Sequence, residues 1–396
     1  MKKILCFILS LLVVLSLGTC AFAADAGAVG FDTDDKSLKF NDDGTFKILM
    51  INDSQDVGKN VQKKMIDFLV KAVETEKPDL VVFVGDQLAD VYPFATAQDY
   101  ALSIENICKP LEDRGVPFLA TLGNHDHDRA NVLNEEGQYE LYNRFNMNYA
   151  SENGPDPFTY NVEVKTHDGR QTAFNIYMMD TNNKATEGGY SGITEEQLSW
   201  YNNTCASLKE ANGGAVVPSI LFQHIPVKEI YKLFKECDWN TPGAIYSRRD
   251  TKWYVLDENK VVNDGGTLGE APCSENFDHI TGQYQAWVKN GDIMGAFFGH
   301  DHVNTFMGTT EDGIKMGYNG GSGFRAYGDM GRRTVRVFEF KENDVTDYET
   351  RLVYHDDLMA QKAGFVLADF FSPSLLTTAM KVVYFFFGWA IKIFAK

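Results

Sequence analysis

The sequence predicts an α/β fold, a single domain built on a parallel sheet, from three observations. Hydrophobic runs at 46–52, 80–84 and 118–121 have the length and composition of buried strands. Between them, stretches at 60–76 and 97–113 place apolar residues at helical spacing. Strands that are joined through helices run parallel, because each connection crosses back over the sheet. The chain of 396 residues is 44% hydrophobic, which is enough for a large core.

The second half of the chain repeats this alternation less regularly. We expect strands at 174–179, 216–223 and 293–298. A helix is expected at 194–208, where Thr194 can cap the first turn and Gln197, three residues on, can complete a capping box. The pattern therefore indicates one α/β domain.

The last strands form a predicted hairpin, and two insertions interrupt the domain. Residues 333–340 and 345–354 alternate apolar and polar positions on either side of a polar Lys-Glu-Asn-Asp turn. Segments near 130–170 and 240–275 follow neither pattern and are expected to be insertions. We place the domain at residues 45–360.

The N-terminus has the features of a secretory signal peptide at residues 1–23. Two lysines precede an apolar run, and small residues end at Ala23, where cleavage is expected. Lipoprotein processing at Cys20 is the alternative, although Thr19 is unsuited to the position before such a cut. The protein is therefore expected to be extracellular or attached to the outer face of a membrane, with residues 24–44 as a flexible polar lead-in.

The C-terminal residues 361–396 form a strongly apolar tail. The run from Leu375 to Phe394 has spanning length, but Lys381 and Lys392 interrupt it. Aromatic residues and lysines suit the interface of a bilayer. Two interpretations stay open: a membrane-associated helix, and a terminal helix packed on the domain.

Charge and cysteine spacing exclude some functions. The net charge is −18, and loss of the two signal-peptide lysines would make it −20. A nucleic-acid-binding surface is not expected, because phosphate backbones require lysine and arginine. A small phosphorylated substrate stays possible, since bound metal ions reverse the local charge. The cysteines outside the signal peptide are too widely spaced for a dense disulfide framework or a thiolate zinc site: Cys108, Cys205, Cys237 and Cys273.

Residue types that bind metals follow five of the predicted strands. In an open parallel sheet the carboxyl ends of the strands meet at one edge, so residues distant in the sequence would converge there. Each stretch alone is compatible with an ordinary turn or a core histidine, but the five together favour a metal site. The residues are Asp53, Asp86, Asn124, His125, His224, His300 and His302.

The same stretches resemble the motifs of a known family. The order of GDQ (85–87), GNHD (123–126), QHIP (223–226) and GHDH (299–302) is similar to that of calcineurin-like metallophosphoesterases, which include purple acid phosphatases. The stretch GGYSGITEEQLSWY at 188–201 resembles the branch of phosphatases related to the yeast phosphatase Dcr2. The resemblance implies a four-layer αββα sandwich of two mixed β-sheets flanked by helices.

The resemblance also implies two divalent metal ions that share Asp86. The first ion would take Asp53, Gln55, Asp86 and His302, and the second would take Asp86, Asn124, His224 and His300. Gln55 stands where the family usually has histidine, and its neutral amide makes the first site rich in oxygen. Among Mn²⁺, Fe²⁺, Mg²⁺ and Zn²⁺, this set favours Mn²⁺ or Fe²⁺.

By the same resemblance, hydroxide held between the metals attacks the phosphate. His125 would be the general acid that protonates the leaving group, with Asp126 orienting its ring. Asn124 and His125 would face the phosphate. Arg325 is a further candidate, because a guanidinium can bind phosphate through two hydrogen bonds.

Three functions stay open. The first is an exported phosphomonoesterase acting on an unidentified phosphorylated substrate. The second is a phosphodiesterase or nucleotide pyrophosphohydrolase with the same centre. The third, from another class, is a secreted metal-binding protein without activity, because Gln55 replaces an expected ligand.

Overall fold

The computed structural model divides the chain into two units, Met1–Lys36 and Ser37–Lys396. The predicted signal peptide and the greater part of the predicted lead-in lie outside the described residues. All helices and strands that the structure describes belong to the second unit. The described residues are 36–58, 62–89, 94–185, 189–262, 265–274, 281–328 and 332–394.

The parallel strands of the first half belong to a five-stranded sheet of order β15-β14-β2-β3-β4. β2 (Thr45–Ile51), β3 (Leu80–Val84) and β4 (Phe118–Thr121) run parallel, as the buried runs predict. β14 (Thr334–Lys341) and β15 (Asp344–Tyr354) form the predicted antiparallel hairpin, and β14 pairs with β2. The C-terminal hairpin therefore completes the N-terminal sheet and makes it mixed.

The other strands form a seven-stranded sheet of order β1-β5-β6-β7-β11-β13-β12. Its centre, from β6 to β13, is parallel, whereas β5 and β12 run antiparallel to neighbours. The alternation of strands and helices predicts one parallel sheet; the structure has two mixed sheets, because the chain crosses to the second sheet after β4. The strands are β1 (Leu38–Lys39), β5 (Tyr160–Lys165), β6 (Thr172–Met179), β7 (Ser219–Gln223), β11 (Ile293–Phe298), β12 (Met307–Thr309) and β13 (Lys315–Tyr318).

The fold begins earlier than the predicted domain boundary at residue 45. Leu38 and Phe40, inside the predicted lead-in 24–44, are buried in the apolar cluster between the sheets. β1 pairs with β5 and carries Leu38, and the backbone amide of Phe40, the next residue after β1, donates to the carbonyl of Lys165 at the end of β5. The prediction of a flexible lead-in is therefore wrong for its last residues, because alternating apolar side chains anchor them.

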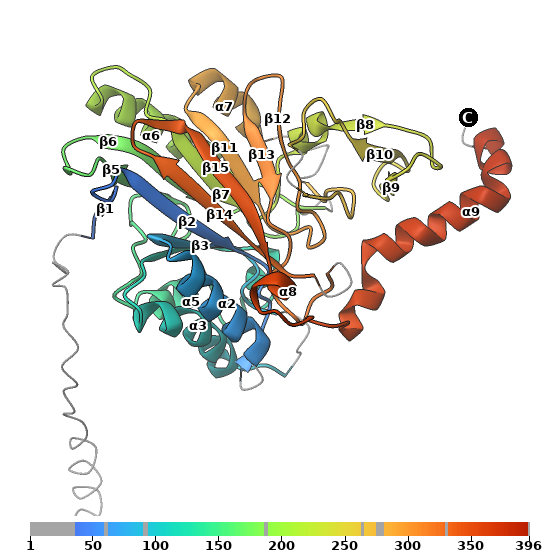
Figure 1. Cartoon of the computed structure of the whole chain (residues 1–396), viewed down its shortest axis with the longest axis horizontal. Helices are drawn as coiled ribbons and strands as arrows, with labels where there is room; N and C mark the ends of the chain where they lie inside the picture. The colour runs from blue at the N-terminus through green and yellow to red at the C-terminus, as the bar shows by residue number, and fades with distance from the viewer. Residues whose placement is uncertain are drawn as a thin grey trace, which may run out of the picture. The chain divides into compact units, whose positions relative to one another are not determined.

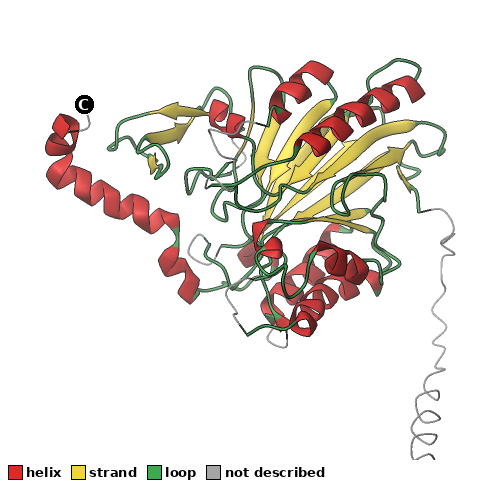
Figure 2. Ribbon diagram, turned by 180° about the vertical axis from the view of Figure 1, so that it is seen from behind, coloured by secondary structure: helices red, strands yellow, loops and turns green. Residues whose placement is uncertain are grey.

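The two sheets pack face to face, and helices cover their outer faces (Figures 1 and 2). Neighbouring side chains of a strand point to opposite faces, so those of β2 alternate between two apolar clusters. Ile48 and Met50 join the cluster between the sheets, whereas Leu49 and Ile51 pack beneath the helices. The unbroken apolar sequence of β2 therefore reflects burial on both faces. The predicted four-layer αββα sandwich is confirmed.

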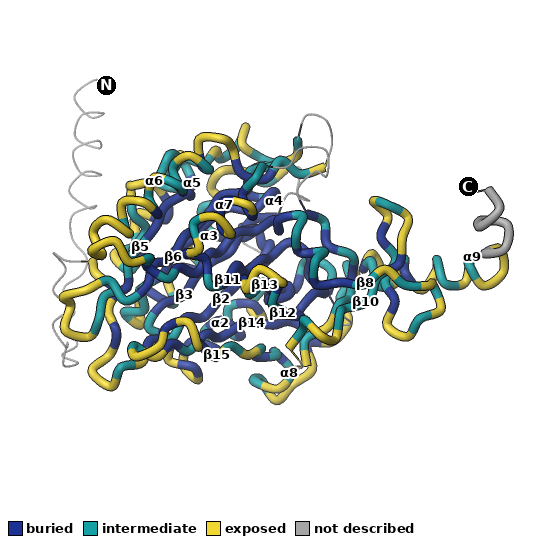
Figure 3. The backbone as a smooth tube through the Cα atoms, turned by 90° about the horizontal axis from the view of Figure 1, so that it is seen from above, coloured by how far each residue is buried: buried dark blue, intermediate teal, exposed yellow. Residues whose placement is uncertain are grey.

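The longer helices of the outer layers are divided between the sheets. α2, α3 and α5 cover the five-stranded sheet, and α6 and α7 cover the seven-stranded sheet (Figure 1). The predicted capping box is confirmed, because the Thr194 hydroxyl accepts a hydrogen bond from the Gln197 amide at 3.1 Å. In Figure 3 the strands lie buried beneath the exposed turns of these helices. The bounds are α2 (Lys63–Glu76), α3 (Ala97–Glu112), α5 (Glu135–Tyr142), α6 (Glu195–Ala211) and α7 (Gln283–Asn290).

A small third sheet occupies part of the predicted insertion near 240–275. β8 (Phe234–Glu236) and β9 (Ile245–Tyr246) both pair antiparallel with β10 (Trp253–Leu256). Apart from the C-terminal helix, the remaining described helices are short. They are α4 (Asn124–His127), α8 (His355–Leu358), and the 3₁₀ helices η2 (Lys228–Leu233) and η3 (Leu367–Phe371).

The apolar tail ends in the long helix α9 (Pro373–Phe394), beside β9 and β10 in Figures 1 and 2. The Thr377 hydroxyl accepts a hydrogen bond from the Tyr246 amide at 3.2 Å, and the Tyr384 ring lies 5.4 Å from that of Trp253. By length and composition the stretch Leu367–Phe387 could cross a membrane, and 11% of its apolar window is buried. The helix therefore contacts the body through part of its surface and exposes the rest.

Candidate metal centre

The loops after β2, β3 and β11 have unusual backbone conformations. Asp53, Gln55, Asp86 and His300 have φ angles of 52°, 38°, 55° and 73°. Non-glycine residues rarely adopt this left-handed region, and such strain concentrates at functional sites. Four residues predicted as ligands therefore share a costly conformation at one edge of the sandwich.

Two glycines let the backbone approach the predicted ligands closely. A Cβ atom at Gly123 would lie 2.3 Å from Oδ1 of Asp86, and one at Gly85 would lie 2.5 Å from Nδ1 of His224. Neither contact is sterically acceptable, so these glycines of the GDQ and GNHD stretches are required for packing around Asp86.

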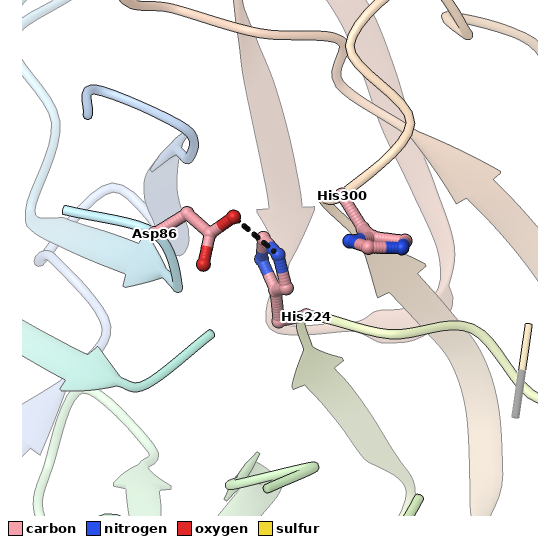
Figure 4. Close-up of side chains that lie close together, drawn as sticks. All are labelled: Asp86, His224 and His300. Carbon is pink, nitrogen blue, oxygen red and sulfur yellow. Dashed lines mark ion pairs between the residues drawn. The ribbon is translucent and has the colours of Figure 1, made fainter. Parts of the chain in front are cut away.

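Asp86 stands at the junction of two groups of possible ligands. Its carboxylate lies within 4.8 Å of donor atoms of His224 and His300, and also within 4.8 Å of those of Asp53 and His302. Figure 4 shows the first group, in which the ring of His224 faces Asp86, with Nε2 3.0 Å from Oδ2. One carboxylate is therefore placed to serve two sites.

Backbone carbonyls fix the orientation of two histidine rings. Nδ1 of His224 lies 3.0 Å from the carbonyl of Val84, and Nδ1 of His302 lies 2.9 Å from the carbonyl of Tyr327. A carbonyl only accepts, so each Nδ1 donates and a neutral ring has its lone pair on Nε2. Nε2 of His302 lies 3.1 Å from Oδ1 of Asp53. Each lone pair thus faces a carboxylate oxygen, which is the arrangement of ligands around a cation.

When the histidine rings are neutral, several buried atoms at this junction face no hydrogen-bond donor within the described part of the chain. They are Oδ1 of Asp53, Oδ1 of Asn124 and Nε2 of His224. A buried polar atom without a partner costs roughly 1–3 kcal/mol. All three are atoms that ligate divalent metals, so a pair of cations would satisfy them. The residues present therefore fit a metal centre of two divalent ions.

Gln55 reaches the same junction. Its Nε2 donates a hydrogen bond to Oδ2 of Asp86 at 3.1 Å, and the side chain is buried. The amide nitrogen, which cannot ligate a metal, is thus the atom that faces the shared carboxylate. Coordination by the amide oxygen of Gln55 stays a prediction.

His125 projects into the pocket, and its partner differs from the predicted one. Nδ1 of His125 lies 2.9 Å from Oδ2 of Asp128, and its side chain is 30% exposed. Asp126 instead accepts hydrogen bonds from the backbone amides of Asp86 and Leu88, at 2.7 and 2.8 Å, and from that of Gly123. The prediction that Asp126 orients His125 is therefore wrong. Adjacent residues on a helical turn point apart, whereas residues three apart share a face, a spacing that could have identified Asp128.

The electrostatic environment favours a neutral His300 and an ionised Asp128. Burial, assisted by His224, lowers the pKa of His300 to about 3, so its ring nitrogens keep a lone pair at neutral pH. The hydrogen bond from His125 lowers the pKa of Asp128 to about 2. The ring of His300 can therefore bind a metal at neutral pH, and the ring of His125 has an ionised carboxylate beside it.

A pocket of about 460 Å³ opens above this junction. Its floor includes Gln55, Asp86, His125, His300 and His302. This volume is typical of a small-molecule site. Sequence reasoning did not assign several other lining residues to the site. Tyr190 belongs to the GGYSG stretch, which was quoted only for its resemblance, and the others come from loops without a quoted motif: Arg248, Glu270, Cys273 and Tyr327.

Arg325 also lines the pocket, as predicted for a substrate-binding residue. Its Nε donates to Oδ1 of Asp56 at 2.5 Å, which holds the guanidinium beside the site. With Arg248 it brings positive charge to the pocket of a protein whose net charge is −18. Binding of phosphate by Arg325 stays a prediction.

Comparison with known proteins shows which proteins this chain is similar to. A protein from Arabidopsis thaliana named probable inactive purple acid phosphatase 14 is 28% identical over 366 residues, covering 83% of this chain and 82% of the relative. Phosphatase DCR2 from Saccharomyces cerevisiae is 24% identical over 345 residues, covering 79% of this chain and 54% of the relative. A solved structure, GAP50, the anchor in the inner membrane complex of Plasmodium, is 13% identical with a TM-score of 0.47, over 85% of this chain and 94% of that one.

The family model described as calcineurin-like phosphoesterase matches residues 46–304, from the start of β2 to the loop after β11. The matched segment contains every residue predicted as a metal ligand. Metal-binding groups of the kind typical of that family are present there. The chain therefore belongs to the calcineurin-like phosphoesterase family.

Proposed function

We propose that this protein hydrolyses phosphate monoesters with two divalent metal ions bound around Asp86. The proposal rests on three buried atoms that can bind a metal and that make no hydrogen bond within the described residues while the histidine rings are neutral: Oδ1 of Asp53, Oδ1 of Asn124 and Nε2 of His224. Burial of these atoms without hydrogen bonds has a physical reason if bound cations take the place of hydrogen-bond donors. Membership of the phosphoesterase family supports the reaction class.

The assignment of ligands follows the two groups that share Asp86. Asp53, His302 and the Gln55 amide would complete the first site, and Asn124, His224 and His300 the second. When bound, such ions offset the charge of the phosphate and acidify a water molecule that can act as nucleophile. The first site is rich in oxygen, which favours Mn²⁺ or Fe²⁺ over Zn²⁺.

His125 is proposed as the general acid. Asp128 accepts from Nδ1 and stabilises the imidazolium form of the ring, whose second proton, on Nε2, can be given to the departing alcohol oxygen. The backbone amide of His125 donates to Oδ1 of Asp86 at 2.8 Å, which couples the position of the acid to the shared ligand. Asp128 acts as a positioning residue, because it fixes the ring without facing Asp86.

Substrate binding is proposed for residues that line or border the pocket. Arg325, held by Asp56, is suited to two hydrogen bonds with a phosphate. Asn124 lies at the start of α4, next to the general acid. No observation favours a diester over a monoester.

A protein that binds metal without catalysis is the second candidate. Gln55 presents an amide nitrogen to Asp86 where the family usually has a histidine ligand. In addition, three Arabidopsis relatives carry names that begin "probable inactive". A weak first site would leave the second site occupied and the reaction slow.

The test compares turnover of p-nitrophenyl phosphate and of its bis-ester across a series of Mn²⁺, Fe²⁺, Mg²⁺ and Zn²⁺. We expect turnover of the monoester that depends on metal, and less turnover of the diester. Preferred turnover of the diester would assign the alternative enzyme. Two bound ions with neither reaction would support the non-catalytic protein, and Val288→Ala, remote from the pocket, controls for the effects of mutagenesis.

Export and membrane attachment are proposed on sequence features alone. The charged, apolar and small-residue pattern of residues 1–23 supports export. The apolar tail supports attachment. Protease accessibility in intact cells, compared with the same cells after lysis, tests the location.

A further inference from the structure

The C-terminal segment contributes one wall of the pocket. Ala368, Phe371 and Pro373 line the same cavity as Gln55 and His125. They belong to η3 and to the first residue of α9, about 240 to 250 residues from the GNHD stretch. The wall is apolar, whereas the floor carries the possible metal ligands.

A buried ion pair fixes this wall in place. The carboxylate of Asp369 lies 3.4 Å from Nη2 of Arg333, and both side chains are completely buried. Asp369 also accepts hydrogen bonds from the amides of Gly328, at 2.8 Å, and of Val366, at 2.9 Å. The wall is therefore built into the fold rather than lying loosely against it.

The same contacts connect the wall to the metal centre. Arg333 donates to the backbone carbonyls of Gly323 and Ala326, in the loop that carries Arg325. In that loop, the carbonyl of Tyr327 holds Nδ1 of His302. A displacement of the C-terminal segment would therefore disturb the substrate arginine and a predicted ligand.

The outer surface of this segment is strongly apolar. Leu367 and Phe371 are 77% and 80% exposed, and Phe365 and Phe370 beside them are also exposed. We call these four residues the apolar rim. A soluble surface rarely gathers such side chains without a binding function. The rim lies directly at the mouth of the pocket through Phe371.

The rim continues into α9, which has the dimensions of a membrane helix. Its 22 residues correspond to about 33 Å, against about 30 Å for the hydrocarbon core of a bilayer. Phe385, Phe386 and Phe387 are exposed, and the mean hydropathy of the stretch is 1.3. A bilayer is the partner that covers the exposed side of such an apolar helix and the adjoining rim together, while the side that carries Thr377 and Tyr384 contacts the body.

We propose that the substrate is a phosphate monoester of a long-chain lipid, which the enzyme takes from the surface of the membrane that receives α9. This inference rests on the proposed phosphomonoesterase activity. The phosphate reaches the floor of the pocket, while the hydrocarbon chains leave across Phe371 and the rest of the rim. Hydrolysis breaks the bond between phosphorus and the lipid oxygen; water supplies the new oxygen on phosphorus, and the lipid alcohol leaves with one proton.

The experiment uses the full chain with phosphatidylcholine vesicles that contain phosphatidic acid. Release of phosphate from these vesicles is divided by release from water-soluble glycerol 3-phosphate, and p-nitrophenyl phosphate reports the basal reaction. We expect a ratio of kcat/KM of at least about 10 in favour of the vesicles. In Leu367→Ser and Phe370→Ser the ratio should fall about tenfold, since each change removes an apolar contact with lipid. Val288→Ser, an exposed valine of α7, should leave the ratio unchanged.

Each other outcome decides against a defined part of the inference. Turnover of p-nitrophenyl phosphate with equal rates on vesicles and glycerol 3-phosphate overturns the lipid substrate alone. An unchanged ratio in both rim variants also overturns it. A dimer in light scattering that dissociates in both variants assigns the rim to a second copy and overturns the membrane contact. Absence of turnover on all three substrates overturns the proposed function, and this inference with it.

Discussion

Asp86, His224 and His300 form one group of possible metal ligands in this protein, and His127, Glu135 and Asp180 form another. In both groups the donor atoms lie within 4.8 Å of one another. Around His127 each ring nitrogen faces a carboxylate: Nδ1 lies 3.1 Å from Glu135, and Nε2 lies 3.0 Å from Asp180. Nδ1 of His224, in contrast, donates to a backbone carbonyl, so only its Nε2, 3.0 Å from Oδ2 of Asp86, faces a carboxylate.

The difference shows that the partner of the second ring nitrogen, a carboxylate or a backbone carbonyl, separates the ion pair from the possible metal site more than composition does. Although burial opposes the charge, Asp180 and Glu135 raise the pKa of His127 to about 11, so both of its nitrogens are protonated at neutral pH. Such a ring has no lone pair for a metal. His300, whose pKa burial lowers to about 3, keeps one. Although burial opposes the charge, Asp86 raises the pKa of His224 to about 9, a smaller rise than that of His127. The predictions below test this contrast, in order of decreasing effect on turnover.

Replacement of Asp86 should have the largest effect. Asp86→Ala removes the only carboxylate common to both groups, so both ions should be lost. Each ion contributes several kcal/mol to the transition state, and turnover should fall on the order of 10³-fold or more. Metal analysis of the purified variant, with kcat/KM, checks this. Two ions per chain in Asp86→Ala would show that Asp86 is not the shared ligand.

Replacement of His125 should lower turnover without loss of metal. A general acid contributes about 10²–10⁴-fold, and His125→Ala should lose that amount on alkyl phosphates. The loss should be smaller on p-nitrophenyl phosphate, because nitrophenolate leaves without a proton. Equal losses on both esters would contradict the assignment of His125 as the acid.

Asp128→Asn should lower turnover about tenfold, the effect of a lost positioning partner. Without the carboxylate the imidazolium is less stable, so the alkaline fall in turnover should move to lower pH. Asp126→Asn is the matched control, because Asp126 binds backbone amides and not His125. It should lower the midpoint of thermal unfolding and leave the pH profile unchanged. The opposite result would restore Asp126 as the partner of His125.

Gln55→His should change the preference for metals more than the maximal rate. Imidazole suits Zn²⁺ and Co²⁺, so half-saturation by these ions should improve by about tenfold. Gln55→Ala should require more Mn²⁺ than the wild type, with rescue at excess metal. Identical titrations for the three proteins would mean that Gln55 only donates its hydrogen bond to Asp86.

The sequence predicts most of the metal junction because strand topology determines it. Asp53, Asp86 and His224 each follow a buried apolar run, and parallel strands bring such ends to one edge. The partner of His125 was assigned incorrectly, since proximity in sequence does not indicate which side chains face each other on a helical turn. The apolar wall at Phe371 was not predicted either, because its position depends on the buried pair of Asp369 and Arg333, which no local pattern reveals.

The smallest effect on turnover is expected at His127. His127→Gln leaves Asp180 without its cation in a buried site, and the free energy of unfolding should fall by about 3 kcal/mol. The pKa of His127 rises from 6.5 in the unfolded chain to about 11 in the folded protein. Its protonation therefore stabilises the fold fully below pH 6.5, and this contribution is lost as the pH rises toward 11.

Urea unfolding at pH 7 and pH 10 measures both consequences. The wild type should lose free energy of unfolding between these two pH values, and the loss should be smaller in His127→Gln, which cannot release that proton. The folded variant should keep its two metal ions and its kcat, because the His127 ring offers no lone pair to a cation. If His127→Gln instead lost metal while its free energy of unfolding stayed unchanged, His127, Glu135 and Asp180 would be a metal site. In that case the presence of carboxylates at both ring nitrogens would not separate the His127 group from the Asp86 group.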